Sequence, residues 1–245
     1  MRNIKLVIEY DGKDFNGWQK QPNKLNIQGT IEQAIKMITG EDVELNASGR
    51  TDAGVHAFGQ VANFKTNSQI PIDKFAIAIN SRLKKSIVIK KAEEVDERFH
   101  SRLNCKRKTY RYVINNSPEG TAIYRNLETH IPQKLDVEAM KKAVKYFEGE
   151  HDFKAFKASG TSSKSSVRTI YEAKVYQNGD RIFIELTGNG FLYNMVRIIA
   201  GTLVEVGLGK IEAEKIPDII QSQKRENAGK TLPPNGLYLL QVKYN

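Results

Sequence analysis

The stretch that decides the organisation of this chain is SGRTDAGVHA, residues 48–57. Two glycines flank Asp52, and the small residues Thr51 and Ala53 beside it leave its carboxylate open to a partner. Asp52 is therefore a candidate catalytic group. The same residues are also typical of an ordinary turn between two strands, so features elsewhere in the chain must decide between the two interpretations.

The sequence on either side of this stretch predicts an α+β half. Short apolar segments at 43–47 and 60–65 indicate two flanking strands, and alternating segments indicate strands at 4–10 and 86–94. A helix is expected at 28–39, where Thr30 and Gln33 fit a capping box and Gly40 a C-terminal cap. A second helix is expected after Pro71. The order is strand, helix, strand, strand, helix, strand.

The second part of the chain repeats this order more loosely. Strands are expected at 109–115, 169–176, 181–186 and 236–243, and helices at 137–147 and 191–206. The prediction is two ferredoxin-like halves, residues 1–104 and 105–245, whose antiparallel sheets join into one continuous sheet. Helices are expected on one face of that sheet, which leaves the other face as a cleft.

The charge of the chain favours a polyanionic partner. It holds 38 Lys and Arg against 28 Asp and Glu, a formal net charge of +10, and nucleic acid is the leading candidate, although a basic protein without such a partner has the same balance. Residues 98–118 contain no acid and interleave cations with Tyr110 and other rings, as in RNA contacts. A strand edge protected by Lys and Arg is the alternative. A basic, Ser-rich loop at 153–171 is either ordered by a partner or simply flexible.

The expected helix 191–206 is apolar on nearly all sides and carries Arg197 in its middle. A buried guanidinium needs a carboxylate, and Asp52 is the most interesting candidate. Arg197 could instead reach a groove edge or pair with Glu205. Arg50 and Arg197 near Asp52 would keep that carboxylate ionised, as a nucleophile or base requires, and Tyr110 could stack on an extruded base.

Other features narrow the chemistry. With one cysteine, an internal disulfide is excluded, and the chain has no phosphate-binding loop, dinucleotide fingerprint or nucleophile elbow. Its four histidines are scattered without ligand spacing, so neither a metal nor another cofactor is expected. No signal peptide or membrane span is predicted. These features favour a cytoplasmic protein that works with side chains alone.

Five motifs resemble the TruA-type family of tRNA pseudouridine synthases and cover essentially the whole chain in the family's order. They are GRTDAGVH at 49–56, GWQ at 17–19, KTYRY at 108–112, GF at 190–191 with MVR at 195–197, and GLYL at 236–239. The resemblance implies isomerisation of uridine to pseudouridine at positions 38, 39 and 40 of the tRNA anticodon stem-loop, by a homodimer, without a cofactor. It makes the expected cleft a basic RNA-binding cleft.

The resemblance also implies roles for four residues. Asp52 is the nucleophile, by attack on ribose C1′, attack on uracil C6, or proton abstraction through a glycal. Tyr110 stacks on the target uracil, Arg50 extrudes the base and Arg197 pairs with Asp52. The candidate RNA contacts are Trp18, Lys20, Arg107, Lys108, Lys157, Lys164 and Arg168.

The alternative function is an RNA-binding or RNA-chaperone protein without chemistry. Such a protein has no need of Asp52 or Tyr110, and both are present. The enzyme is therefore the favoured hypothesis.

Overall fold

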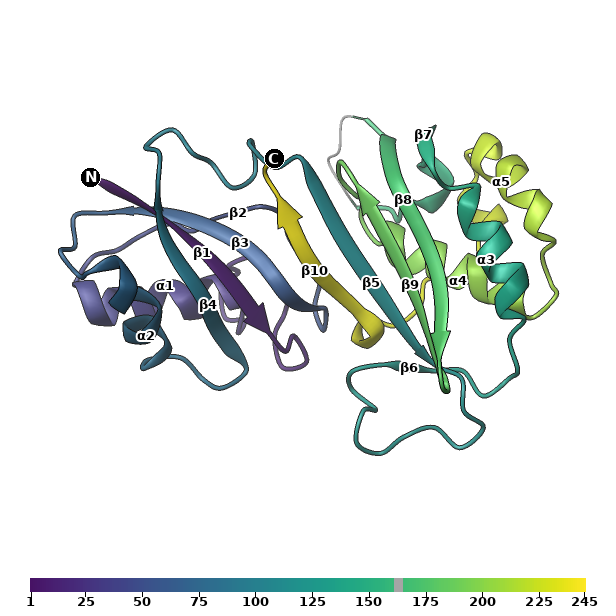
Figure 1. Cartoon of the computed structure of the whole chain (residues 1–245), viewed down its shortest axis with the longest axis horizontal. Coiled ribbons are helices and arrows are strands. Elements are labelled where there is room, and N and C mark those ends of the chain that lie inside the picture. Colours follow the sequence, from purple (N-terminus) through teal and green to yellow (C-terminus); the bar gives the residue numbers. More distant parts are fainter. Residues whose placement is uncertain (161–164) are drawn as a thin grey trace. The chain divides into compact units, whose positions relative to one another are not determined.

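The computed structural model describes residues 1–160 and 165–245, which form two compact units of mixed helix and strand (Figure 1). Unit 1 comprises Met1–Lys106 and Tyr238–Asn245, and unit 2 comprises Arg107–Leu237. The chain is α+β, as predicted, with ten strands and five α-helices in its described part. The strand expected at 236–243 in the second half is Leu237–Lys243 in the structure, and all of it except Leu237 belongs to unit 1.

The sheet of unit 1 has the strand order β4-β1-β3-β10, with β2 paired to β3. β1 is antiparallel to both β3 and β4, whereas β10 is parallel to β3, with Tyr238 opposite His56. The expectation of a purely antiparallel sheet is therefore wrong for this unit. The strands are β1 (Arg2–Tyr10), β2 (Asn46–Ala47), β3 (His56–Thr66), β4 (Ile87–Val95) and β10 (Leu237–Lys243).

Two helices, α1 (Ile27–Thr39) and α2 (Ile72–Asn80), pack beside each other in unit 1. The Phe75 ring of α2 meets Phe64 of β3 at 6.0 Å between centroids, and both side chains are fully buried. The expected capping box is wrong, because Asn26 caps α1 by accepting a hydrogen bond from the Gly29 amide. Gly40 ends α1 in the left-handed region, as predicted.

The sheet of unit 2 has the order β5-β9-β8-β7, with β6 parallel to the far end of β5. The pairs β5–β9, β9–β8 and β8–β7 are antiparallel. The strands are β5 (Arg107–Asn115), β6 (Thr129–His130), β7 (Gly149–Asp152), β8 (Val167–Asn178) and β9 (Arg181–Gly188). The helices are α3 (Val137–Lys145), α4 (Met195–Gly207) and α5 (Ile216–Ser222). Short 3₁₀ helices are Lys154–Phe156, Ala213–Lys215, Arg225–Asn227 and Pro234–Gly236.

Helix α4 is buried on most of its circumference, as its apolar sequence predicts. It begins at Met195, however, and the expected first turn from Phe191 is not helical. Arg197 is consequently the third residue of α4 and half-buried, not a residue of the helix middle. Among the residues described, no helix is both long and apolar enough to cross a membrane.

Candidate active site

Asp52 lies on a tight turn in the segment that joins β2 to β3. The Val55 amide donates to the Asp52 carbonyl at 3.2 Å, and Gly54 at the third position of the turn has a φ of +77°. A positive φ at this position is typical of a type II turn and favours glycine. Asp52 is half-buried and Arg50 is exposed. The turn interpretation is thus confirmed: Asp52 is the first residue of the turn, and the exposed Arg50 lies two residues before it.

Buried polar groups fix the segment before the turn. The Ser48 side chain is fully buried; its hydroxyl donates to Gln60 Oε1 at 2.7 Å and its amide donates to the Val61 carbonyl. Gln60 Nε2 in turn donates to the Gly49 carbonyl at 3.0 Å. The chain therefore enters the turn from a rigid anchor on β3.

Tyr10 holds the next residue of the segment. Its hydroxyl lies 2.7 Å from the Thr51 hydroxyl, and both side chains are buried. Burial raises the pKa of Tyr10 well above its usual range, so the hydroxyl stays protonated and can donate at physiological pH. The residue directly before Asp52 is thereby tied to the end of β1.

The loop after β1 lies directly against the turn. The Trp18 amide donates to the Thr51 carbonyl at 3.0 Å, and the Gly54 amide donates to the Phe15 carbonyl. Gly17 has a φ of +82°, and a Cβ atom there would lie 2.5 Å from the Thr51 carbonyl oxygen. This close approach of two backbones explains why the GWQ motif carries glycine.

Two candidate RNA contacts belong to this loop. The Trp18 side chain is only 2% exposed and its ring packs against Tyr10 at 6.1 Å, which favours a packing role for it. Lys20 is exposed and forms an ion pair with Glu32 at 3.2 Å. Of these two residues, only Lys20 has a side chain that faces solvent.

His56, at the end of the GRTDAGVH motif, belongs to an aromatic stack. Its ring stacks on Tyr238 at 4.9 Å, and Tyr238 stacks on Phe58 at 5.3 Å. The Gly12 amide donates to His56 Nδ1 at 3.1 Å. His56 is thus buried between the loop after β1 and strand β10, and it joins the GRTDAGVH motif to the GLYL motif.

Tyr110 lies on β5 in unit 2 and is 9% exposed. Residues alternate between the two faces of a strand, so Tyr110 shares a face with the fully buried Tyr112 and Ile114. Helix α4 packs against β5. Tyr110 therefore lies on the buried side of β5.

Phe191 packs against Tyr110, an association that the sequence did not predict. The two rings meet edge to face, with centroids 5.1 Å apart and planes at 79°. A Cβ atom on Gly188 would lie 3.3 Å from the Phe191 ring. The GF motif therefore supports the tyrosine of the KTYRY motif. The sequence signal for this contact is that both residues belong to the family's motifs.

The Arg197 guanidinium is held by two hydrogen bonds inside unit 2. Nε donates to the Leu232 carbonyl and Nη1 donates to Asn194 Oδ1, both at 2.7 Å. A cation in the first turn of a helix opposes the helix dipole, which is electropositive at that end. These two acceptors offset that cost. Asn194 was not singled out in the sequence, although it stands between the GF and MVR motifs.

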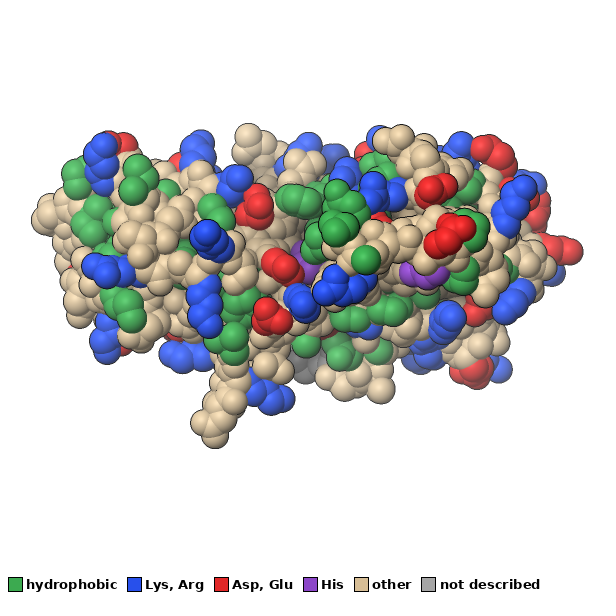
Figure 2. Space-filling model, turned by 90° about the horizontal axis from the view of Figure 1, so that it is seen from below, with side chains coloured by type: hydrophobic (Ala, Val, Ile, Leu, Met, Phe, Trp, Pro, Cys, Tyr) green, Lys and Arg blue, Asp and Glu red, His purple; other side chains and the backbone are tan. Residues whose placement is uncertain are grey.

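The remaining candidate RNA contacts lie in unit 2. Arg107 is exposed and its guanidinium lies 4.5 Å from the centre of the Tyr171 ring, a cation–π contact. Lys108, Lys157 and Arg168 are half-buried, and desolvation lowers the pKa of Arg168 from its usual value. Lys164 lies outside the described residues. On the face in Figure 2, Lys and Arg side chains are dispersed among acidic and hydrophobic ones.

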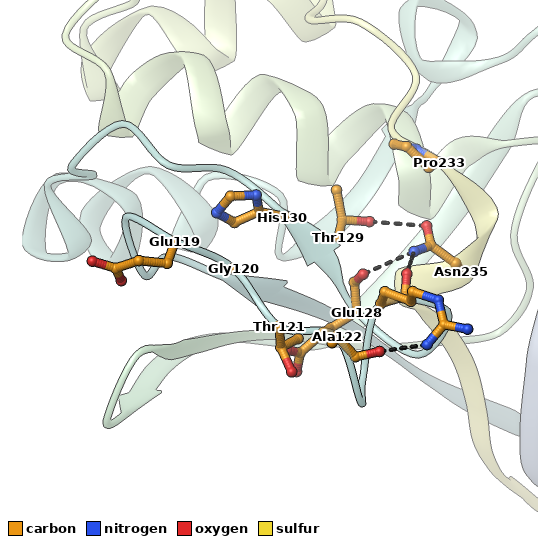
Figure 3. A pocket seen from close by; sticks show the side chains of 10 residues that line it. Glu119, Gly120, Thr121, Ala122, Glu128, Thr129, His130, Pro233 and Asn235 are labelled. Atoms are coloured by element: carbon orange, nitrogen blue, oxygen red, sulfur yellow. Dashed lines mark hydrogen bonds between the residues drawn. The ribbon is translucent and has the colours of Figure 1, made fainter.

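A separate polar pocket of about 520 Å³ opens in unit 2 (Figure 3). Asn235 anchors one wall by donating to the Glu128 carbonyl at 2.8 Å. Tyr112, whose pKa burial raises, fixes the same wall by donating to the Pro233 carbonyl. None of the predicted site residues lines this pocket. In the part of the chain that the structure describes, no group of three or more His, Cys, Asp and Glu residues could hold a metal ion.

The three predicted catalytic residues and the predicted substrate-binding Tyr110 are thus divided between the units. Asp52 and Arg50 lie in the segment between β2 and β3 of unit 1, whereas Tyr110 and Arg197 belong to unit 2. Tyr110 and Arg197 are held by contacts within unit 2. The four residues belong to three of the motifs quoted above, GRTDAGVH, KTYRY and MVR.

Comparison with known proteins identifies the family. The sequence profile described as tRNA pseudouridine synthase matches residues 6–104 and 143–245. The tRNA pseudouridine synthase A of Acetivibrio thermocellus is 55% identical over 244 residues, and that of Ruminiclostridium cellulolyticum is 54% identical over 245 residues. That of Brevibacillus brevis is 47% identical. Each alignment covers 100% of both chains. This chain therefore belongs to the tRNA pseudouridine synthase family.

Proposed function

We propose that this protein isomerises uridine to pseudouridine at positions 38, 39 and 40 of the tRNA anticodon stem-loop. The bond from ribose C1′ to uracil N1 breaks, the uracil turns, and a bond from C1′ to C5 forms. The proton lost from C5 is matched by one gained at N1, so nothing is oxidised or consumed. Side chains and backbone can supply every group that this reaction needs.

The position of Asp52 carries the proposal. Its carboxylate stands on a turn anchored through Ser48, Thr51 and the loop around Gly17, in a chain of this family. A nucleophile held on a rigid turn meets the target base without a further ordering cost. Asp52 is the nucleophile of the proposed reaction.

The other three residues act around Asp52. Arg50 is exposed beside it and suits the extrusion of the target base. Tyr110 stacks on the uracil, supported from behind by Phe191. Arg197 pairs with Asp52 and keeps it ionised.

The partners follow from the same proposal. The net charge of +10 suits a polyanionic substrate, and tRNA is that substrate. We propose that the sheets of the two units join, that the enzyme acts as a homodimer with tRNA contacting both subunits, and that it works in the cytoplasm. Lys20, Arg107, Lys108, Lys157, Lys164 and Arg168 are the proposed phosphate contacts.

Tritium release tests the reaction directly. An anticodon stem-loop transcript carrying 5-³H-uridine loses its label only when C5 exchanges its hydrogen for the bond to C1′. We expect release from transcripts with a single uridine at position 38, 39 or 40, and none from a transcript with uridine elsewhere. Binding of tRNA without any release would instead establish the RNA-binding protein without chemistry.

A further inference from the structure

Asn194, directly before α4, has an unusual backbone conformation. Its φ of 60° and ψ of 7° place it in the left-handed region, which residues other than glycine rarely occupy. Within residues 1–160 and 165–245, the other non-glycine residues with positive φ are Asn23 and Gln223. Such a conformation is strained for a residue with a side chain and persists where other contacts require it.

The side chain of Asn194 does not do what an asparagine usually does at the start of a helix. Asn26 and Asp136 occupy the same position before α1 and α3, and each accepts a hydrogen bond from a first-turn amide. Asn194 makes no such bond. Its Oδ1 accepts from Arg197 Nη1 at 2.7 Å instead. The side chain that would otherwise cap α4 thus binds the Arg197 guanidinium.

A second acceptor completes the arrangement. The Leu232 carbonyl accepts from Arg197 Nε at 2.7 Å, and the Leu232 amide donates to the Arg197 carbonyl at 3.3 Å. A guanidinium is planar, so bonds at Nε and at Nη1 together fix the direction of its plane. Leu232 provides a backbone acceptor that substitution leaves in place, whereas the Asn194 acceptor is a side chain.

We propose that Asn194 is a positioning residue that orients Arg197 for its contact with the catalytic carboxylate. The inference rests on the proposed function of Arg197 as the partner of Asp52. The left-handed backbone of Asn194 directs its side-chain amide toward Arg197. In this orientation the side chain does not cap α4. Asn194 acts through Arg197 and has no contact of its own with the reacting atoms.

The test is Asn194→Gly. Glycine adopts the left-handed region freely, and this gain offsets the added entropy of the unfolded chain, so we expect a Tm within about 3 °C of wild type. We expect kcat for tritium release to fall about 10- to 100-fold, with a much smaller change in KM for tRNA. A purely structural role predicts instead that activity falls only as far as stability does, and that result would overturn the proposal.

The matched control is Gln223→Gly. Gln223 has a φ of 54° at the end of α5, and its side chain donates an exposed hydrogen bond to Asp152. This variant also exchanges a left-handed residue for glycine and loses one side-chain bond in unit 2. We expect its Tm to change by a similar amount and its kcat to equal that of wild type.

A double-mutant cycle separates the inference from the function on which it rests. With Arg197→Lys, which keeps the charge and loses the planar group, Asn194→Gly should reduce kcat by less than about threefold more. A full further loss in that background would show that Asn194 acts independently of Arg197. Wild-type protein without tritium release would refute the proposed function itself, and an unimpaired Arg197→Ala variant would refute the role of Arg197.

Discussion

The Asp52 turn in unit 1 and the start of α4 in unit 2 hold their charged residues by different means. Backbone contacts and the neighbours of Asp52 fix the turn: Thr51 binds Tyr10, and the loop around Gly17 lies against it. Arg197 is fixed through its own guanidinium, by Asn194 and Leu232. The first region is sensitive to added bulk, and the second to the loss of an acceptor.

The largest effect is expected from Asp52→Asn. The carboxamide keeps the shape of the side chain but loses the carboxylate that we propose as the nucleophile, so tritium release should fall by at least about a thousandfold. Binding of the anticodon stem-loop, measured by gel shift, should persist because the turn is held by its neighbours. Substantial turnover by this variant would remove Asp52 from the mechanism.

A smaller but still large effect is expected from Gly17→Ala. The added Cβ atom would lie 2.5 Å from the Thr51 carbonyl oxygen, so the turn must shift. We expect a loss of about 1–3 kcal/mol in unfolding free energy, together with a marked fall in kcat.

Gly40→Ala is the control for this variant. Gly40 has nearly the same positive φ, 76°, but a Cβ atom there would meet nothing within 4 Å. It should therefore carry the backbone strain alone and retain full activity. Equal activities of the two alanine variants would show that the close approach of the loop does not position Asp52.

Tyr10→Phe should have a moderate effect. It leaves the ring in place and removes the hydroxyl that lies 2.7 Å from Thr51. We expect a loss of about 1–2 kcal/mol in stability, as for other buried hydrogen bonds, and a several-fold lower kcat. Tyr112→Phe removes a comparable buried hydroxyl in unit 2. If the two variants lose activity only in proportion to stability, the Tyr10 hydroxyl has no special role at the turn.

Alkaline pH should lower the stability of the unmodified protein, with no effect expected at neutral pH. Burial raises the pKa values of Tyr10, Tyr112 and Tyr244 above the usual value near 10. Above that pH the unfolded chain loses these protons first, so stability is complete below about pH 10 and falls as pH rises further. Each tyrosine contributes up to about 1.4 kcal/mol per pH unit. The free energy of unfolding, measured with urea between about pH 9 and pH 11.5, should fall less steeply with pH for Tyr10→Phe than for wild type.

Local sequence patterns predicted most of the elements, and the departures have identifiable causes. The strand at 4–10 and the helix at 137–147 appear as β1 and α3 within a few residues. The start of α4 was placed too early because Phe191 and Leu192 continue its apolar pattern. A hydrophobic pattern carries no information about the left-handed backbone of Asn194, which sets the helix start.

Long-range pairing was the part that the sequence could not predict. Nothing in the residues of β10 indicates that it lies parallel to β3 in unit 1, because pairing depends on which edge is available. The site residues themselves were identifiable from their motifs. The groups that hold them, such as Tyr10 for Thr51 and Asn194 for Arg197, are visible only once the chain is folded.

The position of β10 has a consequence for how the protein is made. Unit 2 is one uninterrupted segment of chain, whereas unit 1 needs residues 238–245, which the ribosome adds after all of unit 2. Until they emerge, His56 lacks the Tyr238 ring and β3 lacks its parallel neighbour. During synthesis, unit 2 can therefore fold first, and the unit that carries Asp52 reaches its final form only after residues 238–245 have been added.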